Sequence, residues 1–198
     1  PVDFHPKYKN KRALEVVLTT LHAGGKFSSN AYKTSGGLHG VGISVVNALS
    51  SFLRVSVYKE GKVFRQEYSQ GKVKSKVKIE KCNKKIKGTE ITFLPDETIF
   101  DVTIYDAKRL YEFINMKSVL VGGTTITFEI DKELIGDKTI NKRDFYYKNG
   151  IEDYFKLEYS NKNKLFDKDF SLKNKLNQNE NFEVYISFNQ SESSRLQS

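Results

Sequence analysis

Cysteine, tryptophan and long apolar runs are scarce or missing in this 198-residue chain, which has one cysteine and no tryptophan. A single thiol, Cys82, cannot form an internal disulfide, and no group of Cys and His has metal-ligand spacing. No apolar run approaches the roughly 20 residues of a membrane-spanning helix, and no segment resembles a signal peptide. These absences exclude a disulfide-rich secreted protein and a membrane-spanning one, and we expect a cytoplasmic protein without a membrane partner.

Apolar and basic residues are plentiful. Hydrophobic residues make up 38% of the chain, with 14 Phe and 11 Tyr, so enough apolar area exists to offset the entropy of ordering the chain. The length predicts one main domain with a short excursion into a second. The formal charge of +9 favours polyanionic partners, because neutralised phosphates release counterions. A well-solvated, lysine-rich surface would explain the same charge.

Hydrophobic spacing predicts two helices separated by a long glycine-rich loop over residues 24–38. The first helix should end near Gly24, and the second begins in a turn too rich in glycine for good helicity. The expected apolar stripes are Leu14, Val17, Leu18 and Leu21 in the first helix, and Leu38, Val41, Val45, Ala48 and Phe52 in the second.

From residue 53 the apolar period changes to two, which predicts an antiparallel meander with one solvated face. We expect strands over residues 53–58, 63–68, 73–79, 90–94 and 124–130. A helix over 107–114 and a short helix from Ile151, which Asn149 could cap, should follow. The polar stretch 160–181 indicates a linker, and residues 182–188 a last strand.

Two glycine clusters flank the long loop: His22-Ala23-Gly24-Gly25-Lys26-Phe27 and Ser35-Gly36-Gly37-Leu38-His39-Gly40-Val41-Gly42. Glycines let backbone N–H groups approach a phosphate closely, and a helix that begins beyond them adds a favourable dipole. The pattern therefore predicts a polyphosphate cradle. It is not a Walker P-loop, because that motif needs a Gly-Lys-Ser/Thr sequence, which is absent. It is not a Rossmann turn, because the βαβ alternation and the acidic residue that binds ribose are absent as well.

The stretch from Leu18 to Ser50 closely resembles the ATP lid and following helix of the B subunits of type IIA DNA topoisomerases, which are GHKL ATPases. Gly88-Thr89 and the opening Pro1-Val2-Asp3 resemble further motifs of that family. Residues 93–100 and 108–120 are more similar to its topoisomerase IV members than to its gyrase members.

The resemblance implies an α/β fold: a GHKL (Bergerat-type) two-layer sandwich with a mixed, mostly antiparallel sheet backed by helices on one face. It implies an ATP-binding domain over residues 1–159, with its N-terminal part missing, and the beginning of a transducer domain over 160–198.

The same resemblance implies which residues bind ATP. The lid glycines and Lys26 would close over the phosphates, Tyr32 would reach the nucleotide, and Thr89 would contact adenine. The full set of expected ATP-binding residues is Gly24, Gly25, Lys26, Tyr32, Gly36, Gly37, Leu38, His39, Gly40, Val41, Gly42 and Thr89. Val17, Ile43 and Ile91 are candidates for the apolar wall. Taken singly, Lys26 could be a solvated lysine, Tyr32 a packing residue and His39 a helix cap.

The family's general-base glutamate and the asparagine that binds Mg²⁺ would lie before Pro1. We therefore expect no catalytic and no metal-binding residue in this chain, and no ATP hydrolysis by it alone. In the complete enzyme, the resemblance implies an isomerase that uses ATP with Mg²⁺, binds DNA, dimerises through its B subunits on binding ATP, and joins an A subunit in an A2B2 heterotetramer.

Other interpretations remain open from the residues. A mismatch-repair or chaperone ATPase of the GHKL group would share the lid. A plain nucleic-acid-binding module would explain the charge without the paired glycine clusters. A sensor kinase would lack the long Ser/Asn/Tyr lid.

Overall fold

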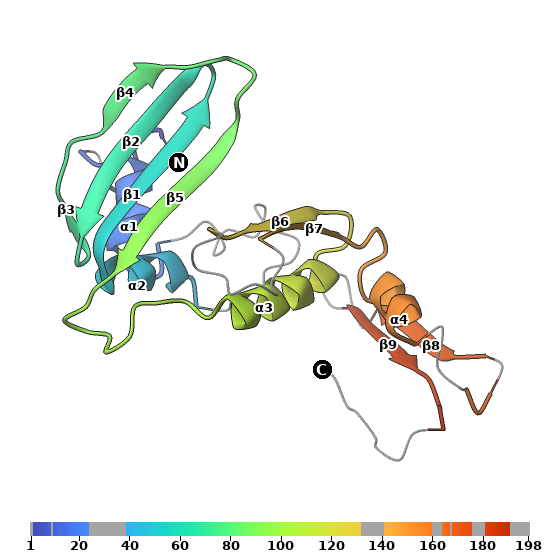
Figure 1. Ribbon diagram of the computed structural model, residues 1–198. Helices are drawn as coiled ribbons and strands as arrows, with labels where there is room; N and C mark the ends of the chain where they lie inside the picture. The colour runs from blue at the N-terminus through green and yellow to red at the C-terminus, as the bar shows by residue number, and fades with distance from the viewer. Residues whose placement is uncertain are drawn as a thin grey trace. The chain divides into compact units, whose positions relative to one another are not determined.

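The structure is a computed structural model that describes residues 2–8, 10–23, 39–131, 141–159, 164–166, 168–175 and 181–190. The chain forms two compact units, residues 1–104 and 105–198. Figure 1 shows a sheet with two helices in the first unit, and two hairpins with two helices in the second. Among the described residues, no helix is long and apolar enough to span a bilayer.

The first unit is built on a five-stranded antiparallel sheet. Its elements are α1 (Ala13–Thr19), α2 (Gly42–Ala48), β1 (Ser50–Lys59), β2 (Lys62–Ser69), β3 (Lys72–Val73), β4 (Lys78–Lys81) and β5 (Gly88–Pro95). The strand order is β3-β2-β1-β5, and β4 also pairs with β2. The α/β class is confirmed, and so is the antiparallel meander from β1 through β2 to β3 and β4, whereas β5 pairs back with β1.

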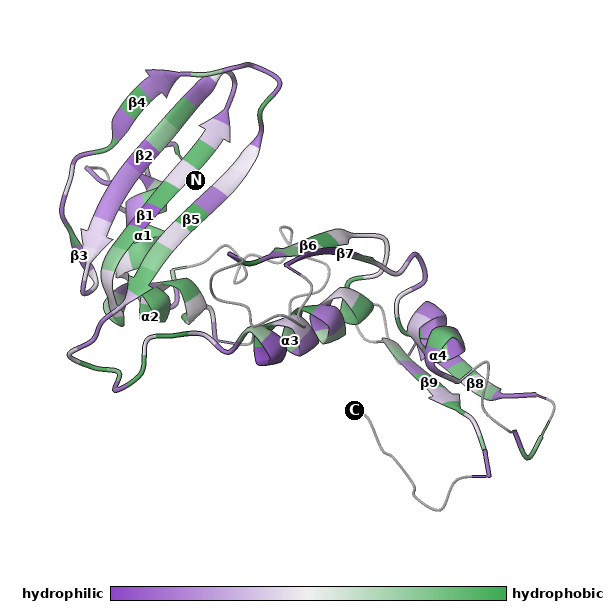
Figure 2. Cartoon of the chain, in the orientation of Figure 1, coloured by the Kyte–Doolittle hydropathy of each residue, from purple (hydrophilic) through white to green (hydrophobic). Residues whose placement is uncertain are grey.

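Alternation along β1 builds the core of this unit. Leu53, Val55 and Val57 are buried and share one face of the sheet, because successive side chains in a strand point to opposite faces. Figure 2 shows this alternation as bands of apolar and polar colour along the strand. The cluster is completed by Val2, Leu14, Leu18 and Tyr68, with Ile43, Val46 and Phe64 packed against it.

The first helix is shorter than predicted. It ends at Thr19, and Thr20 has an extended backbone with φ −128° and ψ 128°. Leu21 is 59% exposed instead of packed. Two adjacent β-branched residues favour an extended backbone, and the Thr19 hydroxyl donates to the carbonyl of Glu15 at 2.8 Å, a contact that competes with continued helix.

The second helix packs a different face from the one predicted. Val45 is 40% exposed, whereas Ser44 and Asn47 are buried and Val46 packs against the core. Phe52 lies in β1, beyond the end of the helix. The helix begins only at Gly42, and the buried amide of Asn47 donates to the Leu18 carbonyl at 2.9 Å, which sets the face that meets α1.

The predicted strand over 73–79 is wrong in its bounds, since it divides into β3 and β4. Between them Ser75 bonds β2 from both its hydroxyl and its carbonyl: the Glu67 amide donates to its hydroxyl at 3.0 Å and the Gln66 side chain donates to its carbonyl at 3.2 Å. These side-chain bonds replace ladder bonds, so the extended run is interrupted.

The second unit contains α3 (Ala107–Leu120), β6 (Thr125–Glu129), β7 (Lys142–Tyr146), α4 (Ile151–Tyr159), β8 (Phe170–Lys175) and β9 (Asn181–Ile186). Tyr111 of α3 meets Phe128 of β6 and Phe145 of β7 edge-on, at 5.7 and 5.1 Å between ring centroids. Phe155 of α4 lies 5.5 Å from Tyr185 of β9. These aromatic contacts attach each helix to its hairpin.

Two expectations for this unit are corrected. The polar stretch 160–181 contains strand β8 and is not only a linker; β8 pairs with β9 through registers such as Leu172 with Val184. Asn149 donates its amide groups to the Asp153 carboxylate at 2.8 and 3.0 Å, where a side-chain N-cap would accept a bond. The expected domain boundary after residue 159 stays a prediction.

Candidate functional site

Five of the expected ATP-binding residues lie in the described part of the chain, all in the first unit: His39, Gly40, Val41, Gly42 and Thr89. The other seven lie outside the described residues: Gly24, Gly25, Lys26, Tyr32, Gly36, Gly37 and Leu38. The described part of the candidate site therefore consists of the turn before α2 and of β5.

The turn before α2 has a backbone that requires glycine. Gly40 has a φ of 62°, a left-handed conformation that other residues adopt at a cost. A side chain added at Gly42, the first residue of α2, would meet no described residue within 4 Å. The turn therefore presents an open backbone surface, as a phosphate cradle requires.

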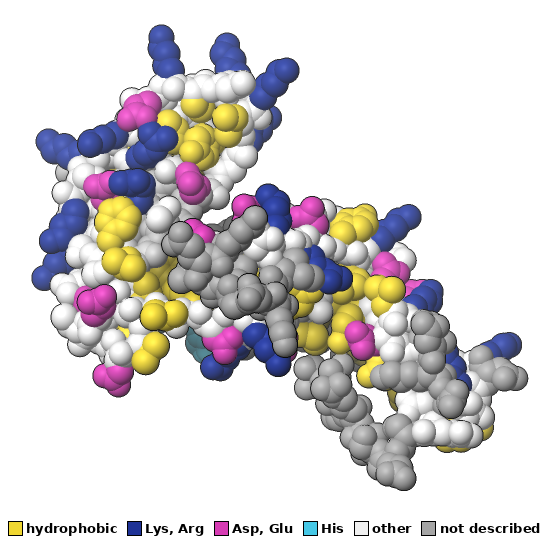
Figure 3. All heavy atoms as spheres, viewed as in Figure 1, with side chains coloured by type: hydrophobic (Ala, Val, Ile, Leu, Met, Phe, Trp, Pro, Cys, Tyr) yellow, Lys and Arg dark blue, Asp and Glu magenta, His cyan; other side chains and the backbone are white. Residues whose placement is uncertain are grey.

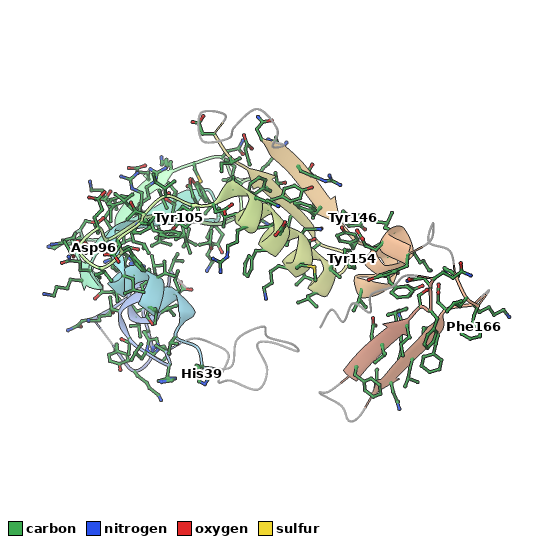
Figure 4. All side chains as sticks on the ribbon, turned by 60° about the horizontal axis from the view of Figure 1, so that its bottom comes forward. His39, Asp96, Tyr105, Tyr146, Tyr154 and Phe166 are labelled. Carbon is green, nitrogen blue, oxygen red and sulfur yellow. The ribbon has the colours of Figure 1, made fainter. Side chains whose placement is uncertain are left out.

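His22 forms a hydrogen bond that joins the two residues flanking the glycine-rich region, His22 and His39. Its Nδ1 lies 2.7 Å from the carbonyl oxygen of His39, and because a carbonyl can only accept, Nδ1 carries the proton. Figure 4 labels His39 just before α2. The sequence alone assigned His22 no role of its own, whereas in the structure it bonds a residue 17 positions further along the chain.

Strand β5 supplies an open apolar wall. Thr89, Ile91 and Phe93 pair with Val57, Val55 and Leu53 of β1, so they share the face of the sheet on which the core lies. Ile91 and Phe93 are nevertheless each 43% exposed. Gly88, with a φ of 139°, begins the strand. Phe93 was missed as a wall residue, although its alternation with Ile91 in the sequence could have indicated it.

Buried polar contacts fix α2 to α1 and to the turn between β2 and β3, and fix the end of β5 to the same turn. The Asn47 side chain donates to the Leu18 carbonyl, and the backbone carbonyl of Asn47 accepts from the Gly71 amide at 3.0 Å. Asp96, labelled in Figure 4 just after β5, is 2% exposed and accepts from the Gln70 amide at 2.6 Å. The hydrogen bonds from Gln70 and then from Thr98 lower the pKa of Asp96. These positioning residues carry no recognisable sequence signal.

The other wall candidates are placed unevenly. Ile43 is half-buried and packs against the core cluster, and Val17 of α1 is half-buried as well, so neither is as open as Ile91. In the described part of the chain, no group of three or more His, Cys, Asp or Glu side chains could hold a metal ion. The expectation that the Mg²⁺ ligand lies outside this chain stays a prediction.

Comparison with known proteins finds relatives of this chain. The B subunit of DNA topoisomerase 4 from Rickettsia bellii is 48% identical over 155 residues, which are 78% of this chain and 23% of the relative. Its counterpart from Caulobacter vibrioides is 46% identical over 155 residues, 78% of this chain and 22% of the relative. The DNA gyrase B protein of Chlamydia muridarum is 41% identical over 171 residues, 84% of this chain and 21% of the relative. No family model matches the chain.

A solved structure has the same fold. The crystal structure of the 43K ATPase domain of Thermus thermophilus gyrase B, in complex with an aminocoumarin, superposes with a TM-score of 0.68 and 29% identity, and covers 89% of this chain and 42% of that one. The fold is therefore that of the GHKL ATPases, a two-layer α/β sandwich.

The chain belongs to the family of type IIA DNA topoisomerase B subunits. It spans about a quarter of the length of the curated topoisomerase IV relatives it matches.

Proposed function

We propose that this chain forms part of the ATP-binding region of a topoisomerase IV B subunit, which uses ATP to drive the passage of one DNA duplex through another. The open turn at residues 40–42, beside a half-exposed apolar wall on β5, supports nucleotide binding. Identities of 44–48% to the Rickettsia topoisomerase IV subunits support that enzyme over gyrase.

The described residues offer contacts for both the phosphates and the base of a nucleotide. Gly40 and Gly42 let backbone N–H groups approach phosphate oxygens without a side chain in the way, and Thr89 at the start of β5 offers a hydroxyl for a base edge. Ile91 and Phe93 offer apolar area against which a base can lose contact with water. ATP, bound with Mg²⁺, would supply the free energy of hydrolysis.

The lid residues 24–38 complete the proposal. Lys26, Gly36, Gly37 and Leu38 would contact the phosphates, and Tyr32 would reach the nucleotide. Contacts to a γ-phosphate that ADP lacks give a differential affinity for ATP, which is what a conformational switch needs. Through this difference in affinity, ATP would favour dimerisation of the B subunits around DNA in an A2B2 enzyme.

A backbone substitution tests the cradle. In a full-length B subunit that carries this sequence, Gly40→Val places a β-branched side chain at a φ of 62°, and we expect ATP binding and turnover to be lost. The matched control is Gly123→Val between α3 and β6, where φ is 79° and an added side chain would meet only the Lys148 carbonyl, at 3.9 Å; it imposes similar backbone strain at a residue outside the expected site. Equal ATP affinity in the two variants would refute the cradle.

Gyrase B is the second candidate, since the gyrase relative from Chlamydia muridarum is 41% identical and the Thermus gyrase domain shares the fold. The two differ in product: ATP-dependent negative supercoiling of relaxed plasmid by the reconstituted enzyme would favour gyrase. Decatenation and relaxation without supercoiling would favour topoisomerase IV.

A further inference from the structure

Most of the chain's net positive charge is concentrated in one short segment. Residues 72–87 contain eight lysines and one acidic residue, Glu80, and so carry a net charge of +7 out of +9 for the whole chain. All eight lysines are exposed. We call them the lysine strip: Lys72, Lys74, Lys76, Lys78, Lys81, Lys84, Lys85 and Lys87.

The lysine strip follows one edge of the sheet. Residues 72–81 run antiparallel along β2, from the pair Ser69 with Lys72 to the pair Lys62 with Lys81. Seven steps along β2, at about 3.3 Å each, give an edge of about 23 Å. Figure 3, viewed as in Figure 1, shows Lys and Arg side chains gathered on the outline beside β3, β4 and the loop that follows β4.

The strip differs from the neighbouring outer face of the sheet, where charges are paired. Arg54 donates to Glu67 at 2.8 Å, Arg65 pairs with Glu80, and Tyr58 donates to Glu90 at 3.0 Å. That face is therefore close to neutral. None of the eight strip lysines makes an ion pair with a described residue.

One lysine of the strip also faces a further lysine on β2. Lys62 of β2 stands directly opposite Lys81 of β4, and like charges directly opposite each other destabilise a sheet. A folding advantage does not explain this arrangement. A polyanion that neutralises both lysines does.

Lysines on an edge strand can protect a sheet against pairing with another chain. That role accounts for only a few of the eight lysines in the strip. Only Lys72, Lys78 and Lys81 lie on the edge strands β3 and β4; the other five lie between or after them. The opposite edge strand, β5, has the sequence GTEITFLP and contains no lysine.

We propose that the lysine strip is a contact surface for the sugar-phosphate backbone of duplex DNA. Duplex DNA carries one negative charge per about 1.7 Å of helix axis, so an edge of about 23 Å faces several phosphates on either strand. The contact is independent of base sequence, because phosphate contacts carry no direct sequence information. The choice of duplex DNA over other polyanions rests on the proposed function.

Neutralisation of the strip tests the proposal. Binding of this chain to a fluorescein-labelled 24-base-pair duplex is measured by anisotropy from 50 to 200 mM salt, for the unaltered chain and for Lys74→Gln/Lys76→Gln/Lys84→Gln/Lys85→Gln. We expect the variant to bind at least about tenfold more weakly at 50 mM salt, and the slope of log K against log salt to flatten by roughly 3 to 4 units. The strip lysines sit on the surface, so the fold should be unchanged.

The matched control removes the same charge elsewhere, in Lys7→Gln/Lys108→Gln/Lys148→Gln/Lys175→Gln, whose four lysines are also exposed. It should lose less than a third as much binding free energy as the strip variant. Equal losses would overturn the proposal in favour of a general charge effect. No salt-dependent binding by the unaltered chain would overturn it as well, as would tighter binding to RNA duplex or to anionic phospholipid vesicles than to DNA.

Nucleotide binding separates this proposal from the proposed function. In the full-length protein, the strip variant should keep its ATP affinity, because the turn at 40–42 and β5 contain none of the substituted lysines. Gly40→Val should lose ATP in the full-length protein while this chain keeps its strip-dependent binding to duplex. Loss of ATP binding in the strip variant with DNA affinity intact would show that the lysines serve the nucleotide site instead, and would overturn the assignment of the strip to DNA.

Discussion

Two neighbouring strands of one sheet show how the same sequence pattern serves two purposes. Leu53 and Val55 of β1 are buried at 0% and 2% exposure, whereas their register partners on β5, Phe93 and Ile91, are each 43% exposed. All four share one face of the sheet. The helices cover β1, which we call the covered half of this face, and leave β5, the open half, exposed. The first strand therefore builds the core and the second a candidate binding wall.

The largest expected effect is on the covered half. Leu53→Ala removes a fully buried side chain and should lower the free energy of unfolding by about 2–5 kcal/mol, measured by urea denaturation. Its partner variant Phe93→Ala, on the open half, should cost about 1 kcal/mol, mostly as lost β-propensity. Similar losses for the two variants would remove the distinction between the halves.

A smaller effect is expected at Tyr68, which is fully buried in the covered half and donates to Gln66 Oε1 at 2.7 Å. Burial raises the pKa of Tyr68 above its ordinary value of 10.0. The folded state therefore resists ionisation more than the unfolded state does, so this contribution to stability is complete below pH 10 and is lost as pH rises above it.

Tyr68→Phe should remove that extra loss of stability above pH 10 and should cost about 1–3 kcal/mol at neutral pH, because the Gln66 acceptor is left without its donor. Urea denaturation at pH 7 and at pH 11 measures both. The control is Tyr105→Phe, at a side chain 50% exposed, which should leave the free energy of unfolding at pH 7 as it is. An unchanged pH dependence in Tyr68→Phe would contradict the burial of this hydroxyl.

The smallest expected effect concerns the open half. In the full-length protein, Ile91→Ala should weaken ATP about tenfold, equivalent to about 1.4 kcal/mol of lost apolar contact, with little change in stability. Ile79→Ala is the matched control, since Ile79 is 48% exposed on the other edge of the sheet. Calorimetric titration measures both affinities, and equal ones would exclude β5 from the binding wall.

Local pattern was enough to predict β1, β2 and β5, because alternation of apolar residues fixes which side chains share a face. It could not predict that Val55 is core and Ile91 is open, since that depends on where α1 and α2 lie. It also failed over residues 73–79, where bonds from Ser75 replace ladder bonds. The end of α1 at Thr19 was hidden because the apolar spacing continues to Leu21.

The candidate site was predictable to a similar degree. Glycine at position 40 indicated a special backbone, and its φ of 62° agrees with that. The supports were not predictable, because Asn47 and Asp96 act through partners 29 and 26 residues away, at Leu18 and Gln70. Contacts over such separations are set by the fold and leave no local sequence signal.

Hydrogen exchange of the full-length protein with and without ATP tests the central claim most directly. If the glycine turn and β5 together bind the nucleotide, ATP should slow the exchange of backbone amides in residues 39–44 and 88–94, while those of β2 stay as they were. Slowed exchange in neither segment under saturating ATP would contradict the assignment of the site.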